Sequence, residues 1–160
     1  MYRILIANGV NLDLLGARPS AFYGSQSLSE LEKFLKNQVP ALEIFLHVKL
    51  SLTFFQSNDE ASFLEKLSEN WHAAVINPGA WTHTSVALAD RLEALALPFV
   101  EVHLSQLARR EPWRKKSHSA KHAVGVLYGF SFDSYLLGLQ GIIRHLQVQN
   151  GGVVPPIAGG

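Results

Sequence analysis

Three segments of the chain gather the residue types that carry acid–base chemistry and bind small anions, namely tyrosine, histidine, glutamate, asparagine, serine and arginine. These residues are Asn11, Arg18 and Tyr23 in the first segment, Asn77 and His83 in the second, and Glu101, His103, Ser105 and Arg114 in the third. Histidine and tyrosine side chains give and take protons, and guanidinium groups hold carboxylates through paired hydrogen bonds. Together the three segments favour acid–base chemistry on a small anionic substrate.

Each of these residues, taken alone, also has a structural explanation. Asn8-Gly9 and Asn77-Pro78-Gly79 are typical turn sequences. A single histidine is more often a packed or exposed side chain than a catalytic one. Only the convergence of the three segments on one cleft favours a functional site over these alternatives.

Several other kinds of site are excluded because their motifs are missing from the sequence. There is no GxxxxGK[ST] or GxGxxG segment for phosphates, and no Gly-x-Ser-x-Gly nucleophile turn. The chain has no cysteine, which excludes disulfides and thiolate sites. The spacing of His83, Asp90 and His103 matches no metal-binding pattern, so we expect neither a metal nor a cofactor.

Short apolar runs alternate with helical patterns, and this alternation predicts the elements that position the polar segments. Strands are predicted over residues 3–7, 44–54, 73–76, 99–102 and 123–128. Helices are predicted to follow the capping residues Ser27 and Ser57, to follow Thr84 or Ser85, and to span residues 131–146.

The boundary between the first helix and the second strand is the least determined by the pattern. Pro40 is expected to end or bend the helix. The start of the strand over 44–54 stays open, because the helix has the alternative of continuing past Pro40. The strand alternates apolar residues with mostly polar ones, which is typical of an edge strand rather than a central parallel strand.

Alternating strands and helices predict an α/β fold, specifically a flavodoxin-like, doubly wound, five-stranded parallel sheet with helices on both faces. We expect one domain over residues 1–148 and a flexible tail rich in glycine and proline over residues 149–160. In such folds ligands bind outside the carboxyl ends of the strands. All three polar segments follow predicted strands, so the fold is expected to bring them together.

Composition sets outer limits on partners and location. The 160 residues are 48% apolar and 17% charged, which is sufficient for a sizeable core. A net charge of +1 gives no electrostatic reason to expect nucleic acid or a membrane surface as a partner. No apolar run approaches the roughly 18 residues of a membrane span, and no signal peptide is recognisable, so a cytoplasmic protein is expected.

Five ordered segments resemble the signatures of the type II 3-dehydroquinate dehydratases. They are residues 8–16 (NGVNLDLLG) with Arg18 and Tyr23-Gly24, 54–58 (FFQSN), 76–80 (INPGA) with 82–88 and Asp90, 101–105 (EVHLS) through 110–114 (REPWR) and Ser117, and 123–126 (AVGV) with Gly129. The resemblance covers about residues 3–146. The chain departs from the family at Val10, Phe55 and Asp59, where Pro, Arg and His are usual.

The resemblance implies a reaction and a catalytic set. The reaction is metal-free dehydration of 3-dehydroquinate to 3-dehydroshikimate through an enolate, in the shikimate pathway or in quinate catabolism. Tyr23 matches the base, and Arg18 matches the cation that favours its phenolate, since an ordinary tyrosine has a pKa of about 10. Asn11 matches a group that stabilises the enolate, and His103 the acid that protonates the departing hydroxyl. Glu101 lies two residues from His103 on the same side of its strand, so it can pair with the imidazole.

The resemblance also implies substrate contacts and an assembly. The matching substrate-binding residues are Asn77, His83, Asp90, Leu104, Ser105 and Arg114. Leu104 and Ser105 match the carboxylate site, whereas Asp90 matches a residue that reaches the site of a neighbouring subunit. The family assembles as a dodecamer built from trimers, so a homo-oligomer is expected.

Two alternatives belong to other functional classes. One is a flavodoxin-like module that binds a nucleotide or a small acid without catalysis, which the fold alone would permit. The other is an inactive relative retained for assembly. A binder has no need of Arg18, Tyr23 and His103 together, and this set is what favours the enzyme.

Overall fold

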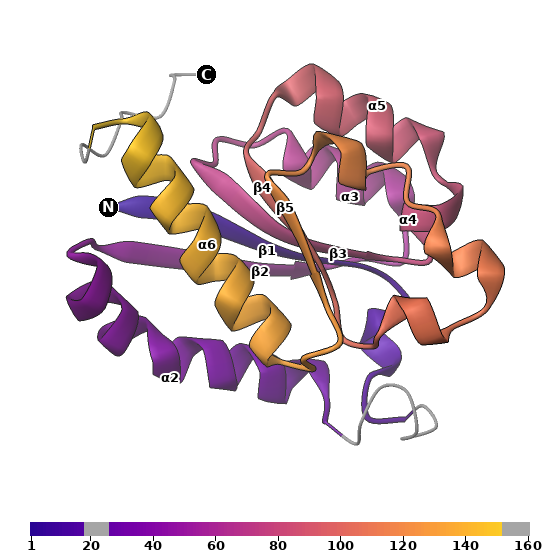
Figure 1. Cartoon of the computed structure of the whole chain (residues 1–160), viewed down its shortest axis with the longest axis horizontal. Coiled ribbons are helices and arrows are strands. Elements are labelled where there is room, and N and C mark those ends of the chain that lie inside the picture. Colours follow the sequence, from indigo (N-terminus) through magenta and orange to yellow (C-terminus); the bar gives the residue numbers. More distant parts are fainter. Residues whose placement is uncertain (18–25, 152–160) are drawn as a thin grey trace.

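The computed structural model describes residues 1–17 and 26–151, and its centre is a five-stranded sheet (Figure 1). The strands are β1 (Tyr2–Val10), β2 (Leu50–Gln56), β3 (Ala73–Gly79), β4 (Phe99–His103) and β5 (Gly125–Tyr128). They lie in the order β2-β1-β3-β4-β5, and every neighbouring pair is parallel. This is the flavodoxin-like order, which confirms the predicted fold class, and β2 is an edge strand as predicted.

Helices cover both faces of the sheet (Figure 1). One face carries α2 (Leu28–Leu46) and α6 (Asp133–Gln149), and the other carries α3 (Glu60–Leu67), α4 (Trp81–Thr84) and α5 (Val86–Leu95). Among the described residues, four short 3-10 segments lie in the connections: η1 (Leu12–Leu14), η2 (Leu107–Arg109), η3 (Pro112–Lys115) and η4 (Ala120–His122). In the part of the chain that the structure describes, no helix is long and apolar enough to cross a membrane.

Two cores, one on each face, come from the alternation of side chains along the strands. Ile4 and Ile6 of β1 pack in the core under α2 and α6, whereas Leu5 and Ala7 pack in the core under α3 and α5. A strand buried on both faces must be apolar at successive positions, which is why the first apolar run predicts a strand so clearly.

Helix α2 continues past Pro40, and this settles the boundary between the helix and the second strand. Ser27 caps the helix with Glu30 in a reciprocal capping box, as predicted. The helix does not end at Pro40, because Leu42 and Leu46 beyond the proline are buried in the same core as the residues before it. Their burial outweighs the hydrogen bond lost at the proline. The second strand therefore begins at Leu50 rather than at residue 44.

Smaller corrections concern helix ends. Asp59, not Ser57, caps α3, because its carboxylate accepts the N–H of Ser62. Ser85 caps α5, but Val86, which the periodicity places inward, is 66% exposed. Helix α6 includes Gln149, the first residue of the predicted tail, and residues 152–160 of that tail lie outside the described residues.

Candidate active site

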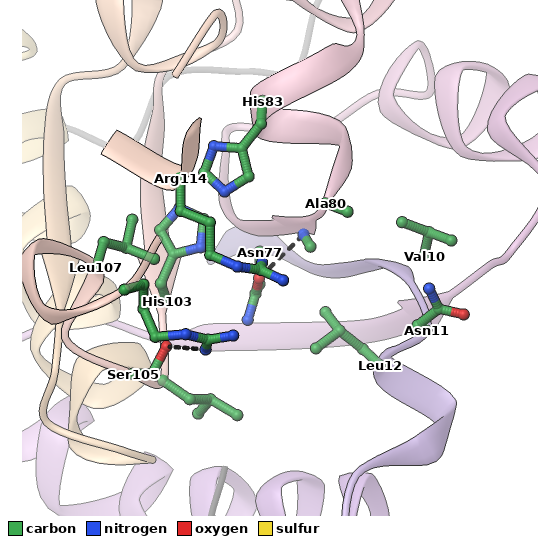
Figure 2. Close-up of a pocket in the computed structure, with 13 residues that line it drawn as sticks. Val10, Asn11, Leu12, Asn77, Ala80, His83, His103, Ser105, Leu107 and Arg114 are labelled. Atoms are coloured by element: carbon green, nitrogen blue, oxygen red, sulfur yellow. Dashed lines mark hydrogen bonds between the residues drawn. The ribbon is translucent and has the colours of Figure 1, made fainter. Parts of the chain in front are cut away.

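A pocket of about 100 Å³ opens at the carboxyl ends of β1, β3 and β4 (Figure 2). This is the edge at which doubly wound folds bind ligands. Its walls are formed by Val10, Asn11, Leu12, Asn77, Gly79, Ala80, His83, His103, Leu104, Ser105, Leu107, Arg110 and Arg114. The three polar segments of the sequence thus meet in one place.

Most of the predicted site residues are brought together here, but not all. Seven of them line the pocket: Asn11, Asn77, His83, His103, Leu104, Ser105 and Arg114. Glu101 is fully buried and hydrogen bonded to His103. Asp90 is exposed on α5 and does not line this pocket. Arg18 and Tyr23 lie outside the described residues.

Asn11 is held in place by the second signature segment. It adopts a left-handed backbone with φ of 64°, a conformation that asparagine tolerates better than most residues. Its N–H donates to Asn58 Oδ1 at 2.7 Å. Gln56 Nε2 donates to the same oxygen, and Asn58 Nδ2 in turn donates to Asp13. The turn that presents Asn11 to the pocket is therefore tied to the end of β2.

His103 and Glu101 form a buried pair at the end of β4. His103 Nε2 lies 2.8 Å from Glu101 Oε1, and because an ionised carboxylate only accepts hydrogen bonds, the imidazole is the donor. The hydroxyl groups of Thr82, Ser117 and Ser119 also donate to Glu101. The carboxylate is thus surrounded by donors although it has no contact with solvent.

These donors explain the charge state of Glu101. Burial by itself raises the pKa of Glu101, but the hydrogen bond and positive charge of His103, with the Ser119 and Thr82 hydroxyls, outweigh it and hold the pKa below its usual value. A carboxyl group whose pKa is lowered on folding stabilises the folded state above its ordinary pKa. That stabilisation is lost as the pH falls below the ordinary glutamate range.

His83, unlike the charged Glu101, is held in its neutral form. Burial is the largest cause that lowers the pKa of His83, and the charges of His103 and Arg114 lower it further, against the raising effect of the Lys116 carbonyl. Its Nδ1 lies 2.6 Å from the carbonyl oxygen of Lys116, so Nδ1 carries the proton. In the neutral ring, Nε2 is then a hydrogen-bond acceptor. The rings of His83 and His103 lie nearly parallel with centroids 6.5 Å apart.

The remaining wall carries two arginines. Arg110 Nη1 donates to Ser105 Oγ at 3.3 Å (Figure 2), and the guanidinium of Arg114 stacks over Trp113, 4.1 Å from the ring centroid. Both arginines form ion pairs with one carboxylate, that of Glu111, which is half exposed. The two guanidinium groups give this wall positive charge, which suits an anionic ligand.

Several lining residues have no predicted role in the sequence. Arg110 lies in the signature segment 110–114, but the resemblance assigns it no role. The apolar lining residues Val10, Leu12 and Leu107 have no role assigned from the sequence, although Val10 and Leu12 lie in the first signature segment. Within residues 1–17 and 26–151, no three His, Cys, Asp or Glu side chains gather in a way that could hold a metal ion.

Comparison with known proteins agrees with this arrangement. The model of the dehydroquinase class II family matches residues 2–143. The 3-dehydroquinate dehydratase of Parasynechococcus marenigrum is 44% identical over 151 residues, which are 92% of this chain and 99% of that protein. The corresponding protein of Clostridium botulinum is 38% identical over 160 residues, covering 96% of this chain and 99% of the relative.

Solved structures agree with the sequence relatives. The type II dehydroquinase of Butyrivibrio crossotus superposes with a TM-score of 0.81 at 27% identity, over 88% of this chain and 97% of that one. The type II dehydroquinase of Propionibacterium acnes superposes with a TM-score of 0.74 at 29% identity, over 90% of this chain and 97% of that one. Because the family model and the relatives span nearly the whole sheet and every strand end that forms the pocket, the chain belongs to the class II dehydroquinase family.

Proposed function

We propose that this pocket binds 3-dehydroquinate and that the chain removes water from it to give 3-dehydroshikimate. The observation that carries the proposal is the buried Glu101–His103 pair, a proton donor placed beside a wall of two arginines. Dehydration of an anionic hydroxy-ketone is served by both features, a proton for the departing hydroxyl and a positive wall that attracts the anionic substrate. The relatives are named for this reaction.

The proposed reaction balances as two proton transfers. Tyr23, as phenolate, takes a proton from the carbon next to the ketone, and the electron pair moves onto the ketone oxygen as an enolate. Asn11 stabilises that oxygen, directly or through a water molecule. The enolate then re-forms the ketone and a carbon–carbon double bond while the C1 hydroxyl departs with a proton from His103. Since His103 Nε2 is bonded to Glu101, the proton comes from Nδ1.

The binding roles are those that the family resemblance implies, and the polarity of the pocket walls is consistent with them. His83 Nε2 accepts a hydrogen bond from a ring hydroxyl, Arg114 donates to another, and Asn77 orients the ring beside His103. The substrate carboxylate is bound by the backbone N–H groups of Leu104 and Ser105 and by the Ser105 hydroxyl. The Ser105 oxygen already accepts a hydrogen bond from Arg110, so its single hydrogen is available for the carboxylate.

The test is direct. Purified protein mixed with 3-dehydroquinate should produce the ultraviolet absorbance of a conjugated enone. EDTA should leave the rate unchanged, and so should borohydride added with substrate, because the proposed steps use neither a metal nor a lysine imine. No absorbance change at any protein concentration would refute the function. Loss with EDTA would indicate a metal, and loss with borohydride an imine.

We also propose that Asp90 acts from a neighbouring subunit in a dodecamer built from trimers. Its carboxylate is exposed on α5, outside the pocket of its own chain, where it is accessible to another copy. Light scattering at micromolar concentration should give a mass twelve times that of the chain. A monomer with full dehydratase activity would refute both the assembly and the role of Asp90.

A further inference from the structure

Three side chains that are linked by two hydrogen bonds lie directly beneath the pocket. Asn77 Nδ2 donates to the hydroxyl of Tyr135 at 2.8 Å, and that hydroxyl donates to Asn8 Oδ1 at 2.6 Å. Tyr135 is fully buried, and Asn8 and Asn77 are only 2% and 3% exposed. Of the three, Asn77 lines the pocket.

The fold places the three residues together from separate elements. Asn8 and Asn77 are paired neighbours in the register of β1 and β3, and Tyr135 stands in the first turn of α6, which covers that face. The rest of this core is apolar, with residues such as Ile6 and Val75 behind the two asparagines. Phenylalanine would fill the space of Tyr135 equally well, so packing alone does not account for the hydroxyl group.

One backbone group determines which atoms donate and which accept in the hydrogen bonds between Asn77, Tyr135 and Asn8. The N–H of Gly79 donates to Asn77 Oδ1 at 3.1 Å (Figure 2), so the amide oxygen of Asn77 faces Gly79 and its NH₂ group faces Tyr135. The phenol oxygen must then accept from Asn77, and its one hydrogen is left for Asn8. With the hydroxyl removed, the Asn77 NH₂ group would be buried without this acceptor, which favours rotation of the amide toward the pocket.

We propose that Tyr135 is a positioning residue for the dehydration, acting through Asn77 by holding its amide in one orientation at the pocket wall. The inference rests on the proposed function, in which Asn77 orients the substrate beside His103. Burial raises the pKa of the Tyr135 phenol well above its usual value, so the phenol stays protonated and serves as a fixed hydrogen-bond relay rather than as a base.

The chain offers a matched control for the removal of this hydroxyl. Tyr2 is also fully buried, and among the described residues its hydroxyl has no hydrogen-bond partner. It stands at the start of β1, at the end of the sheet away from the pocket. Tyr135→Phe is expected to lower kcat for 3-dehydroquinate by about tenfold or more, since small misplacements of a reacting group are costly, whereas Tyr2→Phe stays within about twofold of wild type.

A double-mutant cycle separates positioning from a general loss of stability. If Tyr135 acts through Asn77, then Tyr135→Phe should cost little further kcat/KM in an Asn77→Ala background, with all rates measured well below each variant's Tm. An equal fold-loss in both backgrounds would overturn the inference. If the double variant does not fold, the single variant still decides, because wild-type kcat and KM in Tyr135→Phe would overturn it.

A crystal structure of Tyr135→Phe keeps the test independent of the reaction. The Asn77 side chain is expected to leave its wild-type position or to occupy two orientations, and to stay in place in Tyr2→Phe. An unmoved Asn77 in Tyr135→Phe would overturn the inference whatever the protein catalyses. Absence of dehydratase activity in wild-type protein would instead refute the proposed function.

Discussion

Tyr23→Phe is expected to lower kcat for 3-dehydroquinate by about 10²–10⁴-fold, the range that general base catalysis contributes. Phenylalanine keeps the ring but removes the oxygen that takes the proton next to the ketone. The measurement is steady-state formation of the enone, with Tyr2→Phe as the control that removes a phenol hydroxyl elsewhere in the chain. Wild-type kcat in Tyr23→Phe would mean that another group is the base.

The proposed mechanism also requires the positive charge of Arg18 beside Tyr23. An ordinary tyrosine is a poor base at neutral pH, and a nearby cation lowers a phenol pKa by roughly 1–3 units. Arg18→Ala should therefore move the acid limb of the pH–rate profile to higher pH, because the phenolate forms less readily. Arg18→Lys keeps the charge and should move it less. An unchanged acid limb in Arg18→Ala would remove Arg18 from this role.

The second large effect is expected for His103→Gln, which removes the proton donor to the departing hydroxyl. Loss of a general acid costs about 10²–10⁴-fold in kcat. The control is His47→Gln, because His47 is exposed at the end of α2 and precedes β2, at the sheet end opposite the pocket. Retention of wild-type kcat in His103→Gln, with 3-dehydroquinate as substrate, would refute the assignment of His103 as the acid.

Glu101→Gln tests the pairing that supports His103. The amide keeps the shape of the carboxylate but removes the negative charge next to the imidazole, and a neighbouring negative charge favours the imidazolium form. The alkaline limb of the pH–rate profile is therefore expected to move to lower pH, with a smaller loss of maximal rate than in His103→Gln. An alkaline limb that does not move would show that Glu101 has no influence on proton donation.

The position of the cleft was predictable because it depends on local patterns. Each polar segment begins at the carboxyl end of an apolar strand, and parallel strands end at one edge of the sheet, so the meeting of Asn11, Asn77 and His103 follows from the order of the elements. The pairing of Glu101 with His103 was predictable for a similar reason, since side chains two apart share one face of a strand.

The boundary near Pro40 was not predictable in the same way. Local propensity places a break there, but Leu42 and Leu46 continue the buried stripe of α2 into the core. Whether that burial outweighs a lost hydrogen bond depends on the surface that α2 packs against, which the local sequence does not contain. The second strand starts late for the same reason.

Periodicity and chain order are sufficient to predict the α/β class, the parallel sheet with β2 at its edge, and the residue types at the strand ends. How those residues are held depends instead on contacts between elements that are distant in the sequence. The hydroxyl groups around Glu101 come from Thr82, Ser117 and Ser119, and the phenol that holds Asn77 comes from Tyr135, 58 positions along the chain. In the sequence Tyr135 belongs to the apolar stripe of a helix, and its hydrogen bonds exist only because the packing of α6 on the sheet places its hydroxyl beside Asn8 of β1 and Asn77 of β3. Contacts between residues so far apart produce no periodic pattern in the sequence. They depend on how the elements pack and not on the pattern within any one element.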